Sequence, residues 1–167
     1  MTKKYIKLFS IVILFAVNQL SAQQKNHWSK IDEAKISNTT LQRKTNVKNY
    51  KTFQLDYSEL KNNLIVAPKK NSKLKESNLV VKFPDEKGNM ISFYVKESPV
   101  MHPDLAKKYP NNRSYVGVGV QDKSNKIRFS VNEQGLHAMI TNMERKVQYI
   151  DPITYDQKYY KVYARKD

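Results

Sequence analysis

The feature that most constrains this chain is a series of short apolar segments separated by turn residues, which begins near Leu79 and runs to the end. The turns are short and rich in Asp, Asn, Ser and Gly. Strands spaced by about 8–12 residues indicate antiparallel β-structure and not parallel βαβ units. We therefore predict an α+β, mostly β fold, in which an antiparallel meander forms a curved sheet or a small sandwich, with one or two short helices near the N-terminus. The expected strands cover residues 79–83, 90–95, 115–120, 127–131, 136–141, 147–150 and 159–164.

Two of these segments also indicate which faces are buried. Phe129 shares a face with Ile127 and Val131, because side chains two residues apart in a strand point the same way. In the next segment, Ile140 shares a face with the apolar residues two and four positions before it. We expect Phe129 and Ile140 to be buried in neighbouring strands joined by a turn at residues 132–135.

The chain changes character near residue 75, and we divide it there. Residues 23–75 form a polar, Lys-rich N-terminal segment, and residues 76–167 form the antiparallel β domain. The first of these has few apolar residues per turn, so we expect it to be less protected from proteolysis than residues 79–164.

Three elements are predicted within the N-terminal segment. Residues 28–36 carry apolar groups at helical spacing and predict a short amphipathic helix. Residues 50–55 predict a strand. Residues 59–65 predict a second short helix, capped by Asp56 or Ser58.

The first 22 residues have the pattern of a cleavable export signal. Three lysines fall within the first seven residues, and residues 8–17 are apolar apart from one Ser. This run is about half the length of a membrane-spanning helix and ends near small residues, as a secretory signal does. We expect cleavage between Ala22 and Gln23, and a secreted or periplasmic protein that meets a membrane only through its signal peptide during export. Because the chain has no cysteine, a lipid-modified cysteine at the cut is excluded.

The strong positive charge does not indicate a nucleic-acid partner. The net charge is +15, with 30 Lys and Arg against 15 Asp and Glu. Only five of the bases are Arg, whereas base and phosphate recognition favours the bidentate guanidinium group. A solvated basic surface explains the excess most simply, and an acidic partner surface is the next alternative.

The three histidines do not form a recognisable metal site. His27, His102 and His137 are widely separated, and the chain contains no His-Glu-x-x-His sequence. His137 should lie within a strand on the face of Met139, as a packed or solvent-edge imidazole, whereas His102 lies in an expected loop and could be a ligand. We predict no metal, no cofactor and no catalytic residues, so the chain is not expected to be an enzyme.

Two other patterns have a structural explanation. Gly117 and Gly119 are only part of a dinucleotide-binding fingerprint, and a strand follows where phosphate binding needs a helix. Close backbone approach or strand curvature accounts for them better. The late tyrosines are expected to pack across neighbouring strands rather than to form a stacking platform.

Several segments together resemble a known family. The segments that carry the resemblance are residues 41–44, 50–55, 67–68, 101–110, 114–120, 127–131, 135–140, 149–152 and 163–167. With the export signal, the chain resembles the N-terminal propeptide of secreted, flavobacterial-type reprolysin-like (metzincin) zinc metallopeptidases. The likeness covers essentially the whole chain, and no single motif is diagnostic.

The resemblance implies a non-catalytic folding aid and inhibitor that partners a metallopeptidase catalytic domain, in cis or in trans. Such a domain carries an extended His-Glu-x-x-His motif, which is not present in these residues. The chain thus resembles an isolated prodomain, either a fragment or a short reading frame. Arg165 and Lys166 are candidates for the processing site. Related animal prodomains silence the zinc with a cysteine thiolate, so inhibition here would need occlusion of the cleft, a carboxylate or an imidazole.

A different class of function remains open. The chain could be a stand-alone secreted adhesion or ligand-binding β module. The coding sequence downstream of Asp167 separates the two hypotheses, because an in-frame metzincin motif supports only the propeptide.

Overall fold

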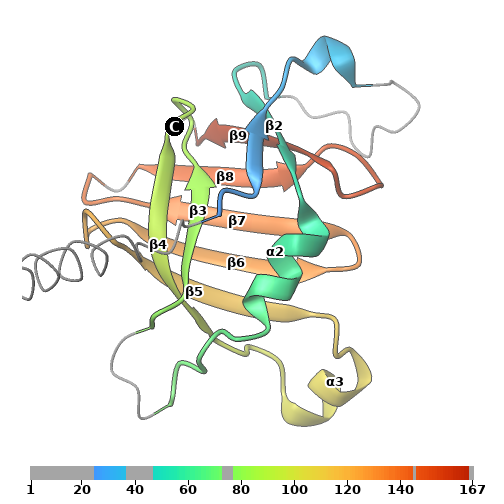
Figure 1. Ribbon diagram of the computed structural model, residues 1–167, viewed down its shortest axis with the longest axis vertical. Coiled ribbons are helices and arrows are strands. Elements are labelled where there is room, and N and C mark those ends of the chain that lie inside the picture. The colour runs from blue at the N-terminus through green and yellow to red at the C-terminus, as the bar shows by residue number, and fades with distance from the viewer. Residues whose placement is uncertain (1–24, 37–46, 73–76, 145, 166–167) are drawn as a thin grey trace, which may run out of the picture.

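The computed structural model describes residues 25–36, 47–72, 77–144 and 146–165. Within these ranges, nine strands form one antiparallel sheet in the order β1-β2-β9-β8-β7-β6-β5-β4-β3, and two short α-helices accompany it (Figure 1). The strands are β1 (Trp28–Lys30), β2 (Lys51–Leu55), β3 (Val80–Pro84), β4 (Met90–Glu97), β5 (Arg113–Gly119), β6 (Lys126–Asn132), β7 (Gly135–Thr141), β8 (Val147–Pro152) and β9 (Tyr159–Ala164). The helices are α2 (Tyr57–Leu64) and α3 (Pro103–Lys108).

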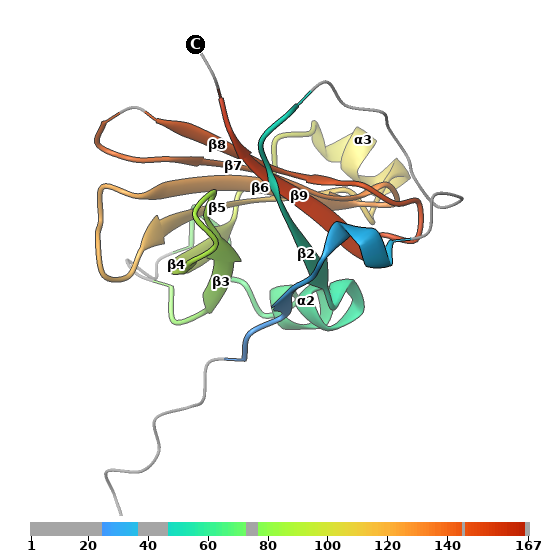
Figure 2. The ribbon, with the colours of Figure 1, turned by 90° about the horizontal axis from the view of Figure 1, so that it is seen from above.

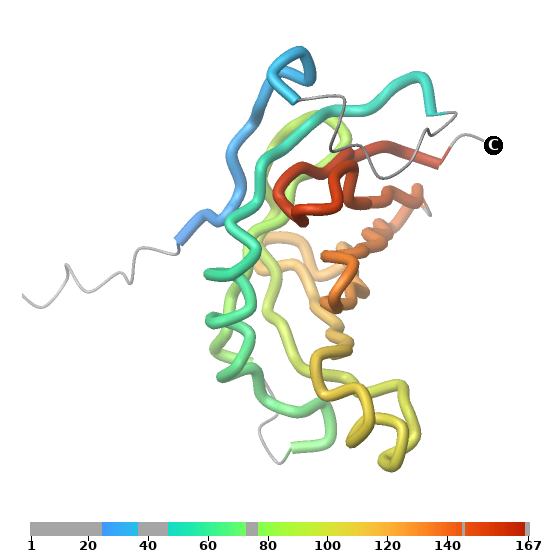
Figure 3. Tube along the Cα trace, turned by 90° about the vertical axis from the view of Figure 1, so that its right-hand side faces the viewer, coloured from blue at the N-terminus to red at the C-terminus, as the bar shows by residue number. Residues whose placement is uncertain are grey.

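From β3 to β9 each strand pairs with the next one along the chain, which confirms the predicted meander. All seven strands expected after residue 79 are present. They form one curved sheet, the first of the two predicted alternatives, and Figure 2 shows α2 and β3 on the same side of strands β6–β8. The tube in Figure 3 shows that α2 runs alongside this curved layer.

The sheet curls until its two end strands meet. Trp28 of β1 and Phe83 of β3 lie with their ring centroids 6.1 Å apart, although these strands stand at opposite ends of the strand order. Trp28 also makes edge contacts with Phe53 of β2 and Tyr160 of β9. The indole ring therefore holds the nearly closed sheet together at its seam.

Helix α2 forms where the sequence predicts it. The Asp56 side chain accepts a hydrogen bond from the backbone N–H of Glu59 at 3.0 Å, which satisfies an otherwise unpaired group in the first turn. Tyr57, Leu60 and Leu64 are buried along one face. This spacing lays the apolar side of the helix on the inner face of the sheet.

The helix predicted over residues 28–36 is wrong. Trp28–Lys30 forms β1, which pairs with β2 so that Trp28 lies opposite Leu55. Only one turn of 3-10 helix, η2 (Glu33–Lys35), follows, with Asp32 as its cap. Pairing with β2 buries the indole more completely than a short surface helix could, so tertiary packing overrides the local spacing.

The segment before residue 75 belongs to the same sheet as the residues after it. Strand β2 pairs with β9, with Phe53 opposite Tyr160. Trp28, Phe53 and Leu60 are almost completely buried in the core. Low apolar content therefore did not indicate few contacts, because the largest apolar side chains of this segment lie in the core, although Ile65 and Val66 are exposed.

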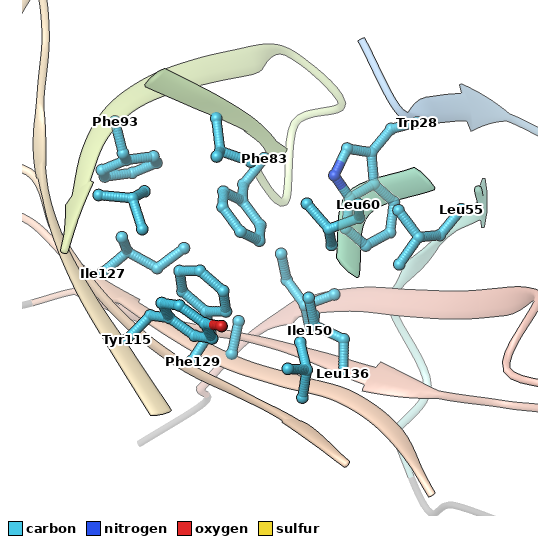
Figure 4. Close-up of a cluster of buried hydrophobic side chains, with 14 of the residues drawn as sticks. Trp28, Leu55, Leu60, Phe83, Phe93, Tyr115, Ile127, Phe129, Leu136 and Ile150 are labelled. Carbon is cyan, nitrogen blue, oxygen red and sulfur yellow. The ribbon is translucent and has the colours of Figure 1, made fainter. Parts of the chain in front are cut away.

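The predicted faces of β6 and β7 are confirmed. Phe129 and Ile140 are both buried, and the two strands are joined by the turn at residues 133–134. Figure 4 shows Phe129 and Leu136 on one side of the core, opposite Phe83 and Leu60 from the covering elements. The core is therefore one cluster of side chains that lies between strands β5–β8 and the segments that fold over them.

Close approach explains the two β5 glycines, as the sequence indicated. A Cβ atom on Gly117 would lie 2.7 Å from the Ile127 side chain, and one on Gly119 would lie 2.2 Å from the carbonyl oxygen of Asp122. Both distances are shorter than real contacts allow. Close packing therefore explains glycine at these two positions, and a phosphate site is not needed to explain it.

Candidate functional site: the outer face of the sheet

Alternation along the strands gives the sheet an inner face that fills the core and a second face that points away from it. We call this second face, on strands β4–β9, the outer face. Antiparallel register aligns its side chains into rows that cross the strands. One row runs from β4 to β9 through cross-strand partners, and we call it the mixed row. Its members are Lys96, Val116, Arg128, Met139, Tyr149 and Tyr163.

A second row, which we call the polar row, lies beside the mixed row. Ser114 lies opposite Ser130, and Ser130 lies opposite His137. The row continues through Asp151 to Lys161, which are also cross-strand partners. The outer face thus places hydroxyl, imidazole, carboxylate and ammonium groups side by side.

The centre of the polar row is a hydrogen-bonded cluster. The imidazole Nδ1 of His137 lies 2.9 Å from one carboxylate oxygen of Asp151, and the Tyr163 hydroxyl donates to the other oxygen at 2.7 Å. This arrangement places the proton of a neutral His137 on Nδ1. The Tyr163 ring packs against the Tyr149 ring with centroids 5.5 Å apart and the ring planes tilted by 32°, which confirms cross-strand packing for this tyrosine pair.

The pKa of the Asp151 carboxyl reflects these contacts. Burial alone would raise this pKa, but the hydrogen bonds from His137 and Tyr163 and the positive charge of Lys161 outweigh burial and lower it. Burial and the same Asp151 bond raise the pKa of the Tyr163 hydroxyl. The cluster therefore holds a carboxylate and a neutral phenol over the whole neutral range.

Acid should weaken the fold through Asp151. A lowered folded-state pKa contributes stability above the unfolded value of about 3.9, and this contribution is lost as pH falls through the folded pKa. We expect Asp151→Asn to reduce the drop in stability between about pH 5 and the acid limit of folding. Urea unfolding midpoints at a series of pH values measure this. Parallel pH curves for the wild type and Asp151→Asn would show that the carboxylate has no such role.

Two hollows lie on the outer face and meet at Val116 and Arg128, which line both. The first has a volume of about 310 Å³ and is lined by Ser130, His137 and Asp151 among others. The second, which we call the basic groove, has a volume of about 720 Å³ and lies over strands β4–β6. Its volume is within the range of ligand sites.

The other two histidines lie away from the outer face cluster. His27 is buried, with Nε2 accepting a hydrogen bond from the Asn63 amide at 2.8 Å and Nδ1 lying 3.5 Å from the Glu59 carboxylate. His102 is exposed at the start of α3, with Nδ1 3.5 Å from Asp104. The sequence places His102 in a loop and His137 on the Met139 face, and both placements are confirmed.

Most of the predicted processing residues fall outside the described part of the chain. Ala22, Gln23 and Lys166 lie there. Arg165 is described: it is exposed after the end of β9, and its backbone N–H donates to the carbonyl of Val147 at 2.8 Å.

Within the described ranges, the structure contains no group of three or more His, Asp or Glu residues arranged to hold a metal ion. None of the helices in the same ranges is long and apolar enough to cross a membrane.

The rows of the outer face were not predicted from the sequence. Period-2 alternation indicates that Arg128 and Met139 point away from the core, but not that they lie opposite each other. That alignment depends on strand register, which the two-residue loop between β6 and β7 and the turn between β5 and β6 determine. A register assigned from those two turns would have predicted the Ser114, Ser130 and His137 alignment.

Comparison of the chain with protein-family models, with curated proteins and with solved structures gave no match.

Proposed function

We propose that this chain is an exported propeptide-like domain, itself non-catalytic, that binds the catalytic domain of a secreted zinc metallopeptidase. It acts as a folding aid and inhibitor of that domain, in cis or in trans. The resemblance of the sequence to reprolysin-like propeptides and the predicted export signal at residues 1–22 support this proposal.

The observation that carries the proposal is the composition of the outer face. The mixed row combines Arg128, Met139, Tyr149 and Tyr163 across neighbouring strands. Arg, Met and Tyr are enriched where proteins contact each other, and Tyr and Arg supply much of the binding energy at such sites. Strands β5–β8 are interior strands with a partner on each side, so this face is a rigid platform for a partner domain.

Inhibition would act without a thiolate, because the chain contains no cysteine. Occlusion of the substrate cleft by the outer face is one route. A second route is an imidazole or carboxylate offered to the catalytic zinc, and we propose His102 and Asp104 for it because both are exposed. Their side chains are 77% and 79% exposed at the start of α3.

Charge adds a long-range component to the attraction. Loss of the three signal-peptide lysines reduces the net charge from +15 to +12. A basic domain of this kind is steered towards an acidic partner, and ionic strength screens the steering. Association should therefore slow as salt increases.

The test is an inhibition assay in trans. Residues 23–167 are added to a purified reprolysin-like catalytic domain from the same genome, and cleavage of a fluorogenic peptide is followed. We expect activity to fall as the chain is added, and we expect thiol-alkylating reagents to leave inhibition intact. The refolding yield of the denatured catalytic domain, with and without the chain, measures the folding-aid role.

Unchanged activity at saturating chain, together with an unchanged refolding yield, would contradict the proposal. In that case the stand-alone adhesion or ligand-binding module becomes the better account.

A further inference from the structure

We infer that the basic groove binds an extended, acidic polypeptide segment that also carries apolar side chains. The inference rests on the proposed function for the identity of the partner. The bound segment would belong to the metallopeptidase domain. Binding itself can be measured without a peptidase.

The floor of the groove is apolar and made of side chains. Val116 and Val118 of β5 point outward there, with Tyr94 of β4 opposite Val118. Tyr94 is 40% exposed, a large fraction for an aromatic ring on a strand. A partner that covers this floor removes apolar surface from water, which favours binding by about 25 cal/mol per Å² of apolar area.

Every charged side chain among the described residues that line the groove is basic. These side chains are Lys70, Lys96, Lys123, Lys126 and Arg128. Asp122 lies in the turn before Lys126, but Ser124 donates to it from both its backbone and its hydroxyl, each at 2.8 Å. These bonds, more than any charge, lower the pKa of the Asp122 carboxyl. Asp122 remains a carboxylate but is not among the residues that line the groove, so the charges on the described lining are all positive.

The spacing of the bases favours several separated anions over one. Lys126 and Arg128 are two residues apart on β6, which is about 7 Å along a strand. Lys96 and Arg128 stand on either side of Val116, two inter-strand steps or about 10 Å apart. A single carboxylate or phosphate headgroup needs donors that converge on it within about 3 Å. An extended peptide instead presents alternate side chains about 7 Å apart, which matches the spacing of these bases.

The partner must be recognised through side chains. Strands β4, β5 and β6 each have a hydrogen-bonded neighbour on both sides, so the floor has no free strand edge to which a peptide could add. Specificity then comes from acidic residues that reach the bases and apolar residues that reach the valines.

The experiment uses residues 23–167 and a fluorescein-labelled peptide of about ten residues. Every second residue of the peptide is Ser, and the residues between them are Glu, Glu, Leu, Val and Glu, so that the acidic and apolar side chains share one face when the peptide is extended. Fluorescence anisotropy gives the Kd. Two comparison peptides separate the contributions: in one, Gln replaces each Glu, and in the other, Ser replaces each apolar residue. Vesicles of phosphatidylglycerol provide the alternative anionic partner.

The protein variants are matched in charge. Lys126→Gln with Arg128→Gln removes two bases from the groove, and Lys107→Gln with Lys108→Gln removes two from α3. All four side chains are exposed, so both variants should fold, which circular dichroism checks. We expect the groove variant to weaken peptide binding by about tenfold or more and the α3 variant by less than about twofold. Both comparison peptides should bind more weakly than the probe.

Three results would overturn the inference: no measurable binding of the acidic peptide, equal losses in the two variants, or binding to vesicles without binding to peptide. If the peptide binds but the chain does not inhibit any metallopeptidase domain, the groove inference is supported and the proposed function fails. If the chain inhibits while the groove variant inhibits equally well, the groove inference alone fails.

Discussion

Replacing Trp28 by Ala should destabilise the protein by about 3–5 kcal/mol, the range for removal of a buried aromatic side chain. Trp28 is 2% exposed and contacts Phe53, Phe83 and Tyr160, which come from three different strands. Its loss leaves a cavity where β1 meets β3 and releases the seam of the sheet. Urea denaturation followed by far-ultraviolet circular dichroism measures the change.

A matched exposed aromatic provides the control for this prediction. Tyr155 is 68% exposed, so Tyr155→Ala should change the free energy of unfolding by less than about 0.5 kcal/mol. If Trp28→Ala behaves like this control, the first strand is not part of the folded core. The stable unit would then begin after it, as its polar sequence suggests.

Replacing Phe129 by Ala should cost a similar amount, about 3–5 kcal/mol. The Phe129 ring stacks on Tyr115 and packs against Phe83, each with centroids 4.9 Å apart. It therefore joins β6 to its neighbour β5 and to β3 across the core. Tyr115 is itself buried, and burial raises the pKa of its hydroxyl to about 12.

A conservative change isolates the packing contribution at this site. Phe129→Leu keeps an apolar side chain and should lose less than Phe129→Ala, because it leaves a smaller cavity. A loss below about 1 kcal/mol for the alanine variant would mean that the faces of β6 are assigned the wrong way round.

Local patterns were sufficient for most of the sheet. Alternation at Ile127, Phe129 and Val131 and the turn signals between segments determine strand positions and faces, because both depend on a few neighbouring residues. The cap at Asp56 likewise locates α2 from local chemistry alone. These elements agree with the sequence because local preference and tertiary packing favour the same structure.

The closure of the sheet could not be predicted in the same way. The contact between Trp28 and Phe83 joins residues 55 positions apart in the sequence, and nothing local signals it. At residues 28–36, helical spacing and strand pairing were both compatible with the pattern. Burial of Trp28 against β2 and β9 decided in favour of the strand.

The candidate site was recognisable only in part. The sequence placed His137 on the Met139 face, but its partner Asp151 lies 14 residues later and is found only through the register of β7 and β8. The basic groove depends on Lys96, Lys126 and Arg128, which belong to two strands separated by β5. In the sequence these bases look like ordinary surface charge.

The central claim is that this chain binds a metallopeptidase domain through its outer face, and titration calorimetry tests it most directly. Residues 23–167 are titrated into the purified reprolysin-like catalytic domain, first as wild type and then as Met139→Glu with Tyr149→Ala, two changes in the mixed row. Lys30→Gln with Lys35→Gln, two exposed lysines outside the outer face and α3, is the control. We predict 1:1 binding that the mixed-row variant weakens by about tenfold or more and the control leaves nearly unchanged. Absence of binding by the folded wild-type chain, or equal binding by the wild type and the mixed-row variant, would contradict the account.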